Sequence, residues 1–134
     1  MAATTKKKVL VADDDPDTLR LVSLLLSRHG LTVITAEDGE EAFHKALTEK
    51  PDAVLLDIML PKMDGLAVCA KLKAEEKTAP IPVGFLTART DLESFKQAQQ
   101  QGGLLYITKP FKPERLVNLV HVLLSSQPAP PAES

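Results

Sequence analysis

Four aspartates crowd into the stretch VADDDPDTL near the start of the chain, directly after an apolar run. They are Asp13, Asp14, Asp15 and Asp17. Neighbouring carboxylates repel one another unless a cation neutralises them or their pKa values rise. Helix capping accounts for two of them, because Asp15 before Pro16 suits an N-cap and Asp17 suits the first helical turn. Asp13 and Asp14 stand before that cap, so we expect them to belong to a site completed from elsewhere in the chain.

A calcium-binding EF-hand loop is one alternative for this stretch. Asp13, Asp15 and Asp17 occupy the alternate positions that such a loop uses, but the loop also needs Gly next and Glu at its twelfth position. This chain has Thr18 and Leu24 at those places. The EF-hand interpretation is therefore excluded.

Three further polar residues each follow an apolar segment, in the stretches AVLLDIMLPKMDG, GFLTAR and YITKPF. They are Asp57, Thr87 and Lys109. If these segments are parallel strands of one sheet, their carboxyl ends meet at one edge, where such folds bind ligands. Carboxylates without a nearby His or Cys favour a hard cation, and Mg²⁺, which keeps several waters and takes one or two direct carboxylates, fits best.

The same side chains suit phosphoryl transfer. Asp57 can act as the nucleophile and form an acyl phosphate, while Lys109 and a metal ion neutralise charge and Thr87 donates a hydrogen bond. Lys109 precedes Pro110, and a cis peptide bond between them would aim the lysine side chain inward.

The elements that must position these residues are apolar segments alternating with segments of helical spacing. Strands are expected at 8–12, 31–36, 53–56, 83–86 and 105–107. Apolar residues at helical spacing follow each of them, beginning at Leu19, Ala42, Leu66, Leu92 and Leu116. This alternation predicts an α/β fold with a parallel sheet and helices on both faces. The continuously apolar first and third strands are the expected centre of the sheet.

The composition limits the classes of function. A chain of 134 residues is expected to form one domain that buries about two-thirds of its unfolded surface. With 44% hydrophobic residues, 25% charged residues and a net charge of -2, it has no electrostatic reason to bind nucleic acid. Cys69 is the only cysteine, which fits a cytoplasmic location, and the apolar stretch after Lys8 is too short to span a membrane.

The stretches VLVADDDP, VLLDIMLPKMDG, FLTAR and YITKPF together resemble the receiver domain of two-component response regulators, in order and spacing. The resemblance covers residues 7–125. It implies a flavodoxin-like three-layer α/β sandwich in which five helices surround a parallel sheet of strand order 2-1-3-4-5. Residues 1–6 are expected to be a disordered N-terminus, and residues 126–134, rich in Pro, Ala and Ser, a tail or linker.

The resemblance also implies a role for each acid. Asp57 would be the phosphoacceptor, Asp14 would bind Mg²⁺ directly, Asp13 would act largely through water, and Met59 would contribute its backbone carbonyl. Mn²⁺ is an expected substitute for Mg²⁺. Such a domain is a signalling phosphoacceptor rather than an enzyme, although it assists its own phosphorylation and dephosphorylation. Its phosphodonor would be a histidine kinase or a histidine phosphotransfer protein.

A switch is implied at Thr87 and Tyr106. A phosphoryl group at Asp57 adds charge and acceptors, so that Thr87 moves toward it and Tyr106 rotates into the vacated space. This repacks the face formed by the fourth helix, fifth strand and fifth helix, where a downstream protein or output domain would bind. The fourth helix, LESFKQAQQQ, has few apolar anchors and suits a moving part.

Four residues depart from the family pattern or vary within it. Leu104 and Leu105 stand where the family often has a small or acidic pair, and we expect at least one to be exposed for a partner, with burial as the alternative. Gly84 is expected to loosen the fourth strand. Arg89 would shield the site entrance or pair with a neighbouring acid.

Two other functions fit parts of the sequence. A phosphorylation-independent interaction module is the alternative that Gly84, Leu104 and Leu105 leave open. A magnesium phosphohydrolase would use Asp13 and Asp15 two residues apart, but so short a chain shows no cap domain. The histidines show no metal-ligand spacing, and we interpret them as surface or helix-end residues; they are His29, His44 and His121.

Overall fold

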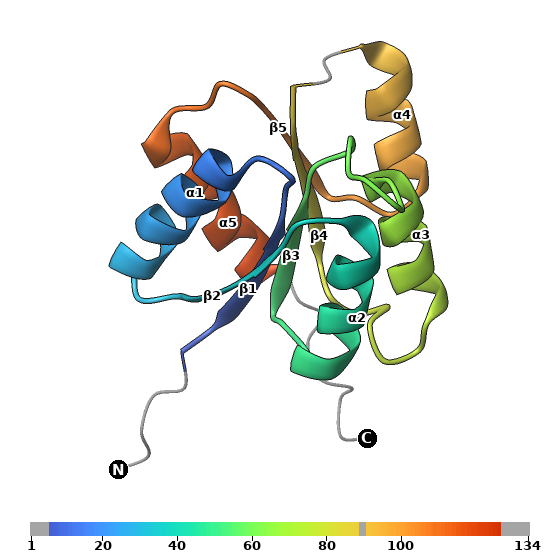
Figure 1. Cartoon of the computed structure of the whole chain (residues 1–134), viewed down its shortest axis with the longest axis horizontal. Helices are drawn as coiled ribbons and strands as arrows, with labels where there is room; N and C mark the ends of the chain where they lie inside the picture. The colour runs from blue at the N-terminus through green and yellow to red at the C-terminus, as the bar shows by residue number, and fades with distance from the viewer. Residues whose placement is uncertain (1–5, 89–90, 127–134) are drawn as a thin grey trace.

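Five strands and five helices alternate along the chain in the computed structural model, which describes residues 6–88 and 91–126 (Figure 1). They are β1 (Lys8–Ala12), α1 (Pro16–Arg28), β2 (Thr32–Ala36), α2 (Gly39–Glu49), β3 (Ala53–Leu56), α3 (Gly65–Ala74), β4 (Val83–Thr87), α4 (Leu92–Gln100), β5 (Leu105–Thr108) and α5 (Pro113–Ser125). The predicted strands are confirmed with small shifts. β2 begins one residue later, because Leu31 closes the turn after α1 by donating its N–H to Leu26. β4 and β5 are each one residue longer, because Thr87 pairs with Thr108.

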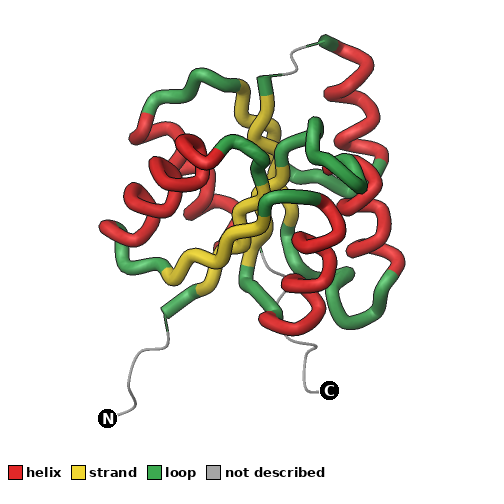
Figure 2. Tube along the Cα trace, viewed as in Figure 1, coloured by secondary structure: helices red, strands yellow, loops and turns green. Residues whose placement is uncertain are grey.

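The sheet is parallel and has the predicted order β2-β1-β3-β4-β5. It runs through the middle of the molecule, with α1 and α5 on one side and α2, α3 and α4 on the other (Figures 1 and 2). This confirms the three-layer flavodoxin-like sandwich. β3 is buried along its whole length and β1 along all but its first residue, as expected for strands covered on both faces.

Two apolar cores lie on the two faces of the sheet. Successive side chains of a strand point to opposite faces, so Leu10 joins the core under α2 and α3 while Val9 and Val11 join the core under α1 and α5. Phe85 is the largest fully buried side chain and belongs to the first core. Cys69 is buried in the same core, which confirms its interpretation as a packing residue.

Aspartates begin four of the five helices. The N-cap residues Asp15, Asp38, Asp64 and Asp91 each accept a hydrogen bond from a backbone N–H in the first turn that follows. Such bonds satisfy donors that have no partner inside the helix. The prediction that Asp15 caps a helix starting at Pro16 is therefore confirmed.

Gly84 leaves no gap in β4, contrary to the expectation that it loosens the strand. It pairs in register with Leu55 of β3 and Leu105 of β5. A Cβ placed on Gly84 would lie 3.0 Å from Leu123 Cδ1 and 3.2 Å from Leu55 Cδ2. The leucines thus fill the space that a side chain would take, and the glycine permits close packing of α5 against the sheet.

Some predictions concern residues outside the described ranges. Arg89 is one of these, as are nearly all residues of the expected N-terminus (1–6) and tail (126–134). Among the residues that the structure describes, none of the helices combines the length and the apolar character needed to cross a bilayer.

Candidate functional site

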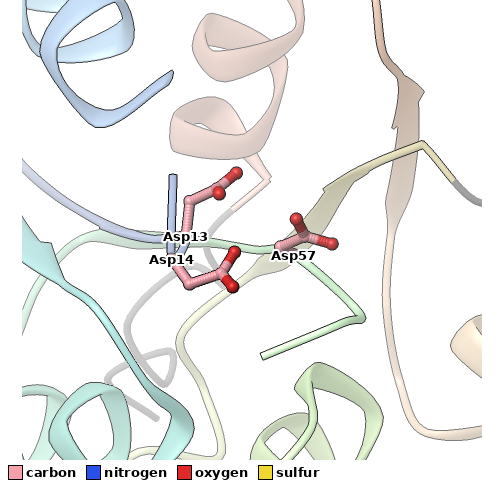
Figure 3. Close-up of side chains that lie close together, drawn as sticks. All are labelled: Asp13, Asp14 and Asp57. Carbon is pink, nitrogen blue, oxygen red and sulfur yellow. The ribbon is translucent and has the colours of Figure 1, made fainter. Parts of the chain in front are cut away.

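Three carboxylates meet at the carboxyl ends of β1 and β3. Asp13, Asp14 and Asp57 each place one carboxylate oxygen within 4.8 Å of the others (Figure 3). Asp13 and Asp57 are buried, whereas Asp14 is exposed. Asp57 therefore forms one cluster with Asp13 and Asp14, although it lies far from them in the sequence, as the sequence predicted.

The sheet itself brings these acids together. β1 and β3 are neighbours, and Ala12 is in register with Leu56, so the next residue of each strand reaches the same level. The ladders also continue past the strand ends, because the N–H of Asp57 donates to the carbonyl of Ala12 at 3.0 Å and that of Asp13 to Ala36 at 3.0 Å. Backbone hydrogen bonds thus fix the start of both acidic loops.

Lys109 links two of the acids. Its Nζ donates to Asp13 Oδ2 at 2.5 Å and to Asp57 Oδ2 at 2.9 Å. The residue follows β5, where its N–H donates to the Thr87 carbonyl at 2.9 Å, and the Lys109–Pro110 peptide bond is cis, as predicted. Burial by itself would lower the pKa of Lys109, but hydrogen bonds to the two carboxylates and their negative charge outweigh it and raise the pKa above its usual value.

Asp13 is the most enclosed of the three acids. Asp13 Oδ2 accepts a hydrogen bond from the Lys109 ammonium. Asp13 Oδ1 accepts a second hydrogen bond from the N–H of Asp15, at 2.9 Å. Burial raises the pKa of its carboxyl above the usual value, and the nearby charge of Asp57 adds to this, although both hydrogen bonds and the charge of Lys109 oppose it. Among the residues that the structure describes, Lys109 is the one cationic side chain hydrogen-bonded to this cluster of three carboxylates, and the remaining negative charge favours a bound cation.

The side chain of Asp15 takes no part in this cluster. Its Oδ1 accepts from the N–H of Asp17 at 3.1 Å and its Oδ2 from the hydroxyl of Thr18 at 2.9 Å. These hydrogen bonds hold its pKa below the usual value. A general acid needs a raised pKa, so this geometry argues against the phosphohydrolase alternative, in which Asp15 would act as acid and base.

The loop after β3 holds Asp57 from the other side. The N–H of Met59 donates to Asp57 Oδ1 at 3.0 Å, while the Met59 side chain is exposed. Gly65, at the start of α3, donates its N–H to the Ile58 carbonyl at 2.8 Å. A Cβ on Gly65 would collide with the backbone carbonyl of Asp57. Sequence reasoning missed this positioning role, for which the Asp-Gly pair in LPKMDG was the available signal.

Thr87 and Tyr106 belong to β4 and β5, the two strands that follow β3 across the sheet. Thr87 is fully buried at the end of β4, next to the strand that carries Asp57. Tyr106 in β5 is partly buried, with its ring centre 6.5 Å from that of Phe85 and 5.4 Å from that of Phe95. Tyr106 therefore lies between a core ring and a surface ring.

The two leucines before Tyr106 differ in burial. Leu104 is 55% exposed, whereas Leu105 is partly buried against the core under α1 and α5. Leu104 lines a small hollow together with Phe95 of α4, whose side chain is also exposed. The expectation that at least one of the two leucines is exposed is confirmed, and the alternative of burial applies to Leu105.

A hollow of about 550 Å³ opens beside the acids. Its lining combines residues of the loops after β1 and β3 with residues of α4; they include Asp14, Met59, Pro61, Asp64, Ser94 and Gln97. Side chains near the cluster and side chains of α4 thus border the same open space.

The family model described as response regulator receiver domain matches residues 9–121. The chain belongs to the response regulator receiver family. Among curated relatives, the Bacillus subtilis alkaline phosphatase synthesis transcriptional regulatory protein PhoP is 43% identical over 118 residues, which are 88% of this chain and 48% of PhoP. The DNA-binding response regulator MtrA of Mycolicibacterium smegmatis is 36% identical over 97% of this chain and 56% of its own length. This receiver domain thus spans about half the length of these relatives.

Solved receiver structures have the same fold. The Vibrio cholerae chemotaxis protein CheY4 has a TM-score of 0.85 and 30% identity, covering 90% of this chain and 100% of CheY4. The receiver domain of the sensor histidine kinase PA1611 from Pseudomonas aeruginosa has a TM-score of 0.84 and 27% identity, covering 91% of this chain and 100% of its own. That structure contains a magnesium ion coordinated in the active site cleft. Family and fold are therefore as the sequence motifs predicted.

Proposed function

We propose that this receiver domain accepts a phosphoryl group on Asp57 from a histidine kinase or a histidine phosphotransfer protein. The observation that carries the proposal is the meeting of Asp57, Asp13 and Asp14 within 4.8 Å, with the Lys109 ammonium 2.9 Å from Asp57 Oδ2. A carboxylate held beside a cation and further acids is the set of groups that aspartyl phosphorylation needs.

Asp57 would act as the nucleophile. One of its oxygens attacks the phosphorus, the bond from phosphorus to the donor histidine nitrogen breaks, and the electron pair leaves with the imidazole. Lys109 is close enough to follow the charge onto the phosphoryl oxygens, and the Met59 N–H holds the other Asp57 oxygen at 3.0 Å. Thr87, at the end of the next strand, would donate its hydroxyl to the new phosphoryl group.

The acids suit Mg²⁺, with Mn²⁺ as a substitute, because the cluster offers oxygen donors only. Asp14 is exposed and would bind the ion directly, with Asp57 and the backbone carbonyl of Met59. Both oxygens of Asp13 already accept hydrogen bonds, which suits a role largely through water. When bound, the ion neutralises charge on the transferring oxygens.

Phosphorylation of Asp57 would change the packing of the face formed by α4, β5 and α5. Phosphorylation adds about -1.5 to -2 charge beside Thr87. A shift of Thr87 would let Tyr106 turn further inward from its place between Phe85 and Phe95, and so change the surface that α4 presents. A downstream protein or an output domain would bind that surface, whereas direct binding of nucleic acid by this domain has no support from its net charge of -2.

Intact-mass measurement tests the central step. The native protein and two variants, Asp57→Asn and Asp17→Asn, are incubated with Mg²⁺ and a small-molecule phosphodonor. Native protein and Asp17→Asn, whose exposed carboxylate lies outside the cluster, are expected to gain the mass of one phosphoryl group, and Asp57→Asn none. Absence of a gain in the native protein, or an equal gain in Asp57→Asn, would overturn the proposal.

A phosphorylation-independent interaction module remains the second candidate, because exposed Phe95 and Leu104 line one small hollow on the α4 side without any modification. Sedimentation of the native protein and Asp57→Asn, with and without phosphodonor, separates the two functions. Self-association or partner binding that is equal in all four samples would favour the second.

A further inference from the structure

Two histidines meet on the side of the sheet that carries α1 and α5. These helices lie side by side (Figure 1), with His29 at the C-cap of α1 and His121 in α5. Their ring centres are 6.3 Å apart and the ring planes make an angle of 72°. Both side chains are exposed. The sequence spacing gave no reason to pair them. The three histidines are exposed, as interpreted, but the fold brings these two together.

One hydrogen bond decides which nitrogen of His29 is available. His29 Nδ1 lies 2.9 Å from the carbonyl oxygen of Leu25. A carbonyl oxygen only accepts, so Nδ1 must carry the hydrogen, and the lone pair of the neutral ring is on Nε2. Histidines that bind metals commonly donate their other N–H in this way to a backbone carbonyl, which orients the ring.

We propose that His29 and His121 form a two-histidine site for a borderline transition-metal dication, such as Zn²⁺, Ni²⁺ or Cu²⁺. With metal–nitrogen bonds of about 2.0–2.1 Å, two imidazoles on one tetrahedral ion have ring centres about 5 Å apart. The observed 6.3 Å is about 1 Å longer, a gap that rotation of the exposed His121 side chain can close while His29 keeps its hydrogen bond to Leu25. Water would complete the coordination.

The surroundings offer further oxygen donors. A hollow of about 300 Å³ beside His29 is also lined by Glu114 and Asn118 of α5, which precede His121 by about two turns and one turn of the helix. The chain's only thiol is not a competing ligand, because Cys69 is buried and burial raises its pKa to about 11. The two imidazoles are therefore the nitrogen donors on this face.

This site is separate from the acid cluster. Asp13 and Asp14 precede the start of α1, and His29 follows its end, so a helix of 13 residues, about 20 Å long, stands between them. The donors differ as well, because carboxylates suit Mg²⁺ and imidazoles suit Zn²⁺, Ni²⁺ and Cu²⁺. A bound ion would join the C-terminal end of α1 to α5 above the apolar contacts that already hold them.

Histidine NMR with Zn²⁺ tests the site, in excess Mg²⁺ to occupy the acids. His44, exposed in α2 on the other side of the sheet, is the internal control. We expect the His29 and His121 ring signals to shift together while His44 stays unchanged. His29→Asn or His121→Gln should weaken binding by about tenfold or more, because the second ligand no longer binds intramolecularly. His44→Asn should bind as the native protein does.

A thermal melt gives a second readout. Zn²⁺ should raise Tm in the native protein, His44→Asn and Asp57→Asn, and should lose this effect in His29→Asn and His121→Gln. Folding of each variant is checked from its backbone amide spectrum. The site is refuted if His44 responds at the same Zn²⁺ concentration as the pair, or if either paired variant binds Zn²⁺ as tightly as the native protein.

Discussion

The acid cluster and the α4–β5 face differ in how their side chains are held. Asp13 and Asp57 are buried and engaged by Lys109 and backbone N–H groups. On α4, by contrast, the buried residues are Ser94 and Ala98, which offer little apolar surface, and the larger apolar side chains face outward. The polar network fixes the acid cluster, whereas weak packing leaves α4 with few anchors.

The helices α1 and α4 also differ in how firmly their side chains are packed. α1 buries Leu19, Val22 and Leu26 against the sheet, in agreement with its predicted helical spacing. α4 buries a hydroxyl that donates to the Asp91 carboxylate at its N-cap. We therefore expect α4 to open locally at a much lower free energy than α1, and hydrogen exchange would measure this difference.

Loss of Lys109 should break the acid cluster most severely. Lys109→Ala removes the cation beside Asp57, and loss of one such group typically slows a reaction by about 10²–10³-fold. The rate of mass gain with a small phosphodonor would show the effect. Lys112→Ala removes an exposed lysine and should react at the native rate, so an equal loss in both variants would mean that general surface charge is responsible.

A methyl group on Gly65 should disturb the same cluster through the backbone. Gly65→Ala places a Cβ against the Asp57 carbonyl, and overpacking of this kind typically costs about 1–3 kcal/mol, occasionally more. Denaturant unfolding would measure the lost stability, and phosphorylation should slow as well. Unchanged stability together with native phosphorylation would show that the loop moves aside freely.

The adjacent leucines sharpen the contrast between core and face. Leu105→Ala should lower the free energy of unfolding by about 1–2 kcal/mol, because this side chain packs against the core. Leu104→Ala should change it by less than about 0.5 kcal/mol, because the side chain is 55% exposed. If Leu104 serves a partner, its substitution should instead weaken association, measured by sedimentation, and no change in binding or self-association would count against that contact.

The smallest expected effect is a change in the stability of Asp13→Asn relative to the native protein, which should reverse its sign when Mg²⁺ is added. The folded-state pKa of Asp13 is raised, so the carboxyl stabilises the fold below the pKa of the unfolded chain, and this contribution is lost as pH rises through the folded-state pKa. At neutral pH without divalent cations, Asp13→Asn should therefore be more stable than the native protein. With Mg²⁺ in excess the order should reverse, because the variant lacks one acid of the cluster. Thermal melts with EDTA and with Mg²⁺ would test both halves.

Hydrophobic period and strand-end position were enough to predict the parallel sheet and the convergence of Asp13, Asp57 and Lys109, whereas the strand order was implied by the family resemblance. The sheet and the convergence follow from repeats within the chain and from the rule that parallel strands end at one edge. The tight approach of Gly65 to Asp57 could not be predicted, because it depends on the distance between two elements. The same holds for Gly84, whose space Leu123 fills from α5.

Two other features depend on contacts that no local pattern encodes. Lys73 in α3 donates to the carbonyls of Ala79 and Ile81 at 3.0 and 2.6 Å and so holds the connection to β4. An amphipathic helix pattern places such a lysine in solvent by default. His29 and His121 likewise meet only because α1 and α5 lie together on one face of the sheet.

The double engagement of Lys109 has a thermodynamic consequence. One ammonium group now satisfies both Asp13 and Asp57, so any ligand that draws it toward one acid takes it from the other. A phosphoryl group on Asp57 would compete for Lys109 and leave Asp13 more dependent on a cation. By reciprocity, cation binding and the equilibrium of Asp57 phosphorylation should be coupled with equal free energy in both directions. The strength of this coupling would depend on a single lysine between two carboxylates.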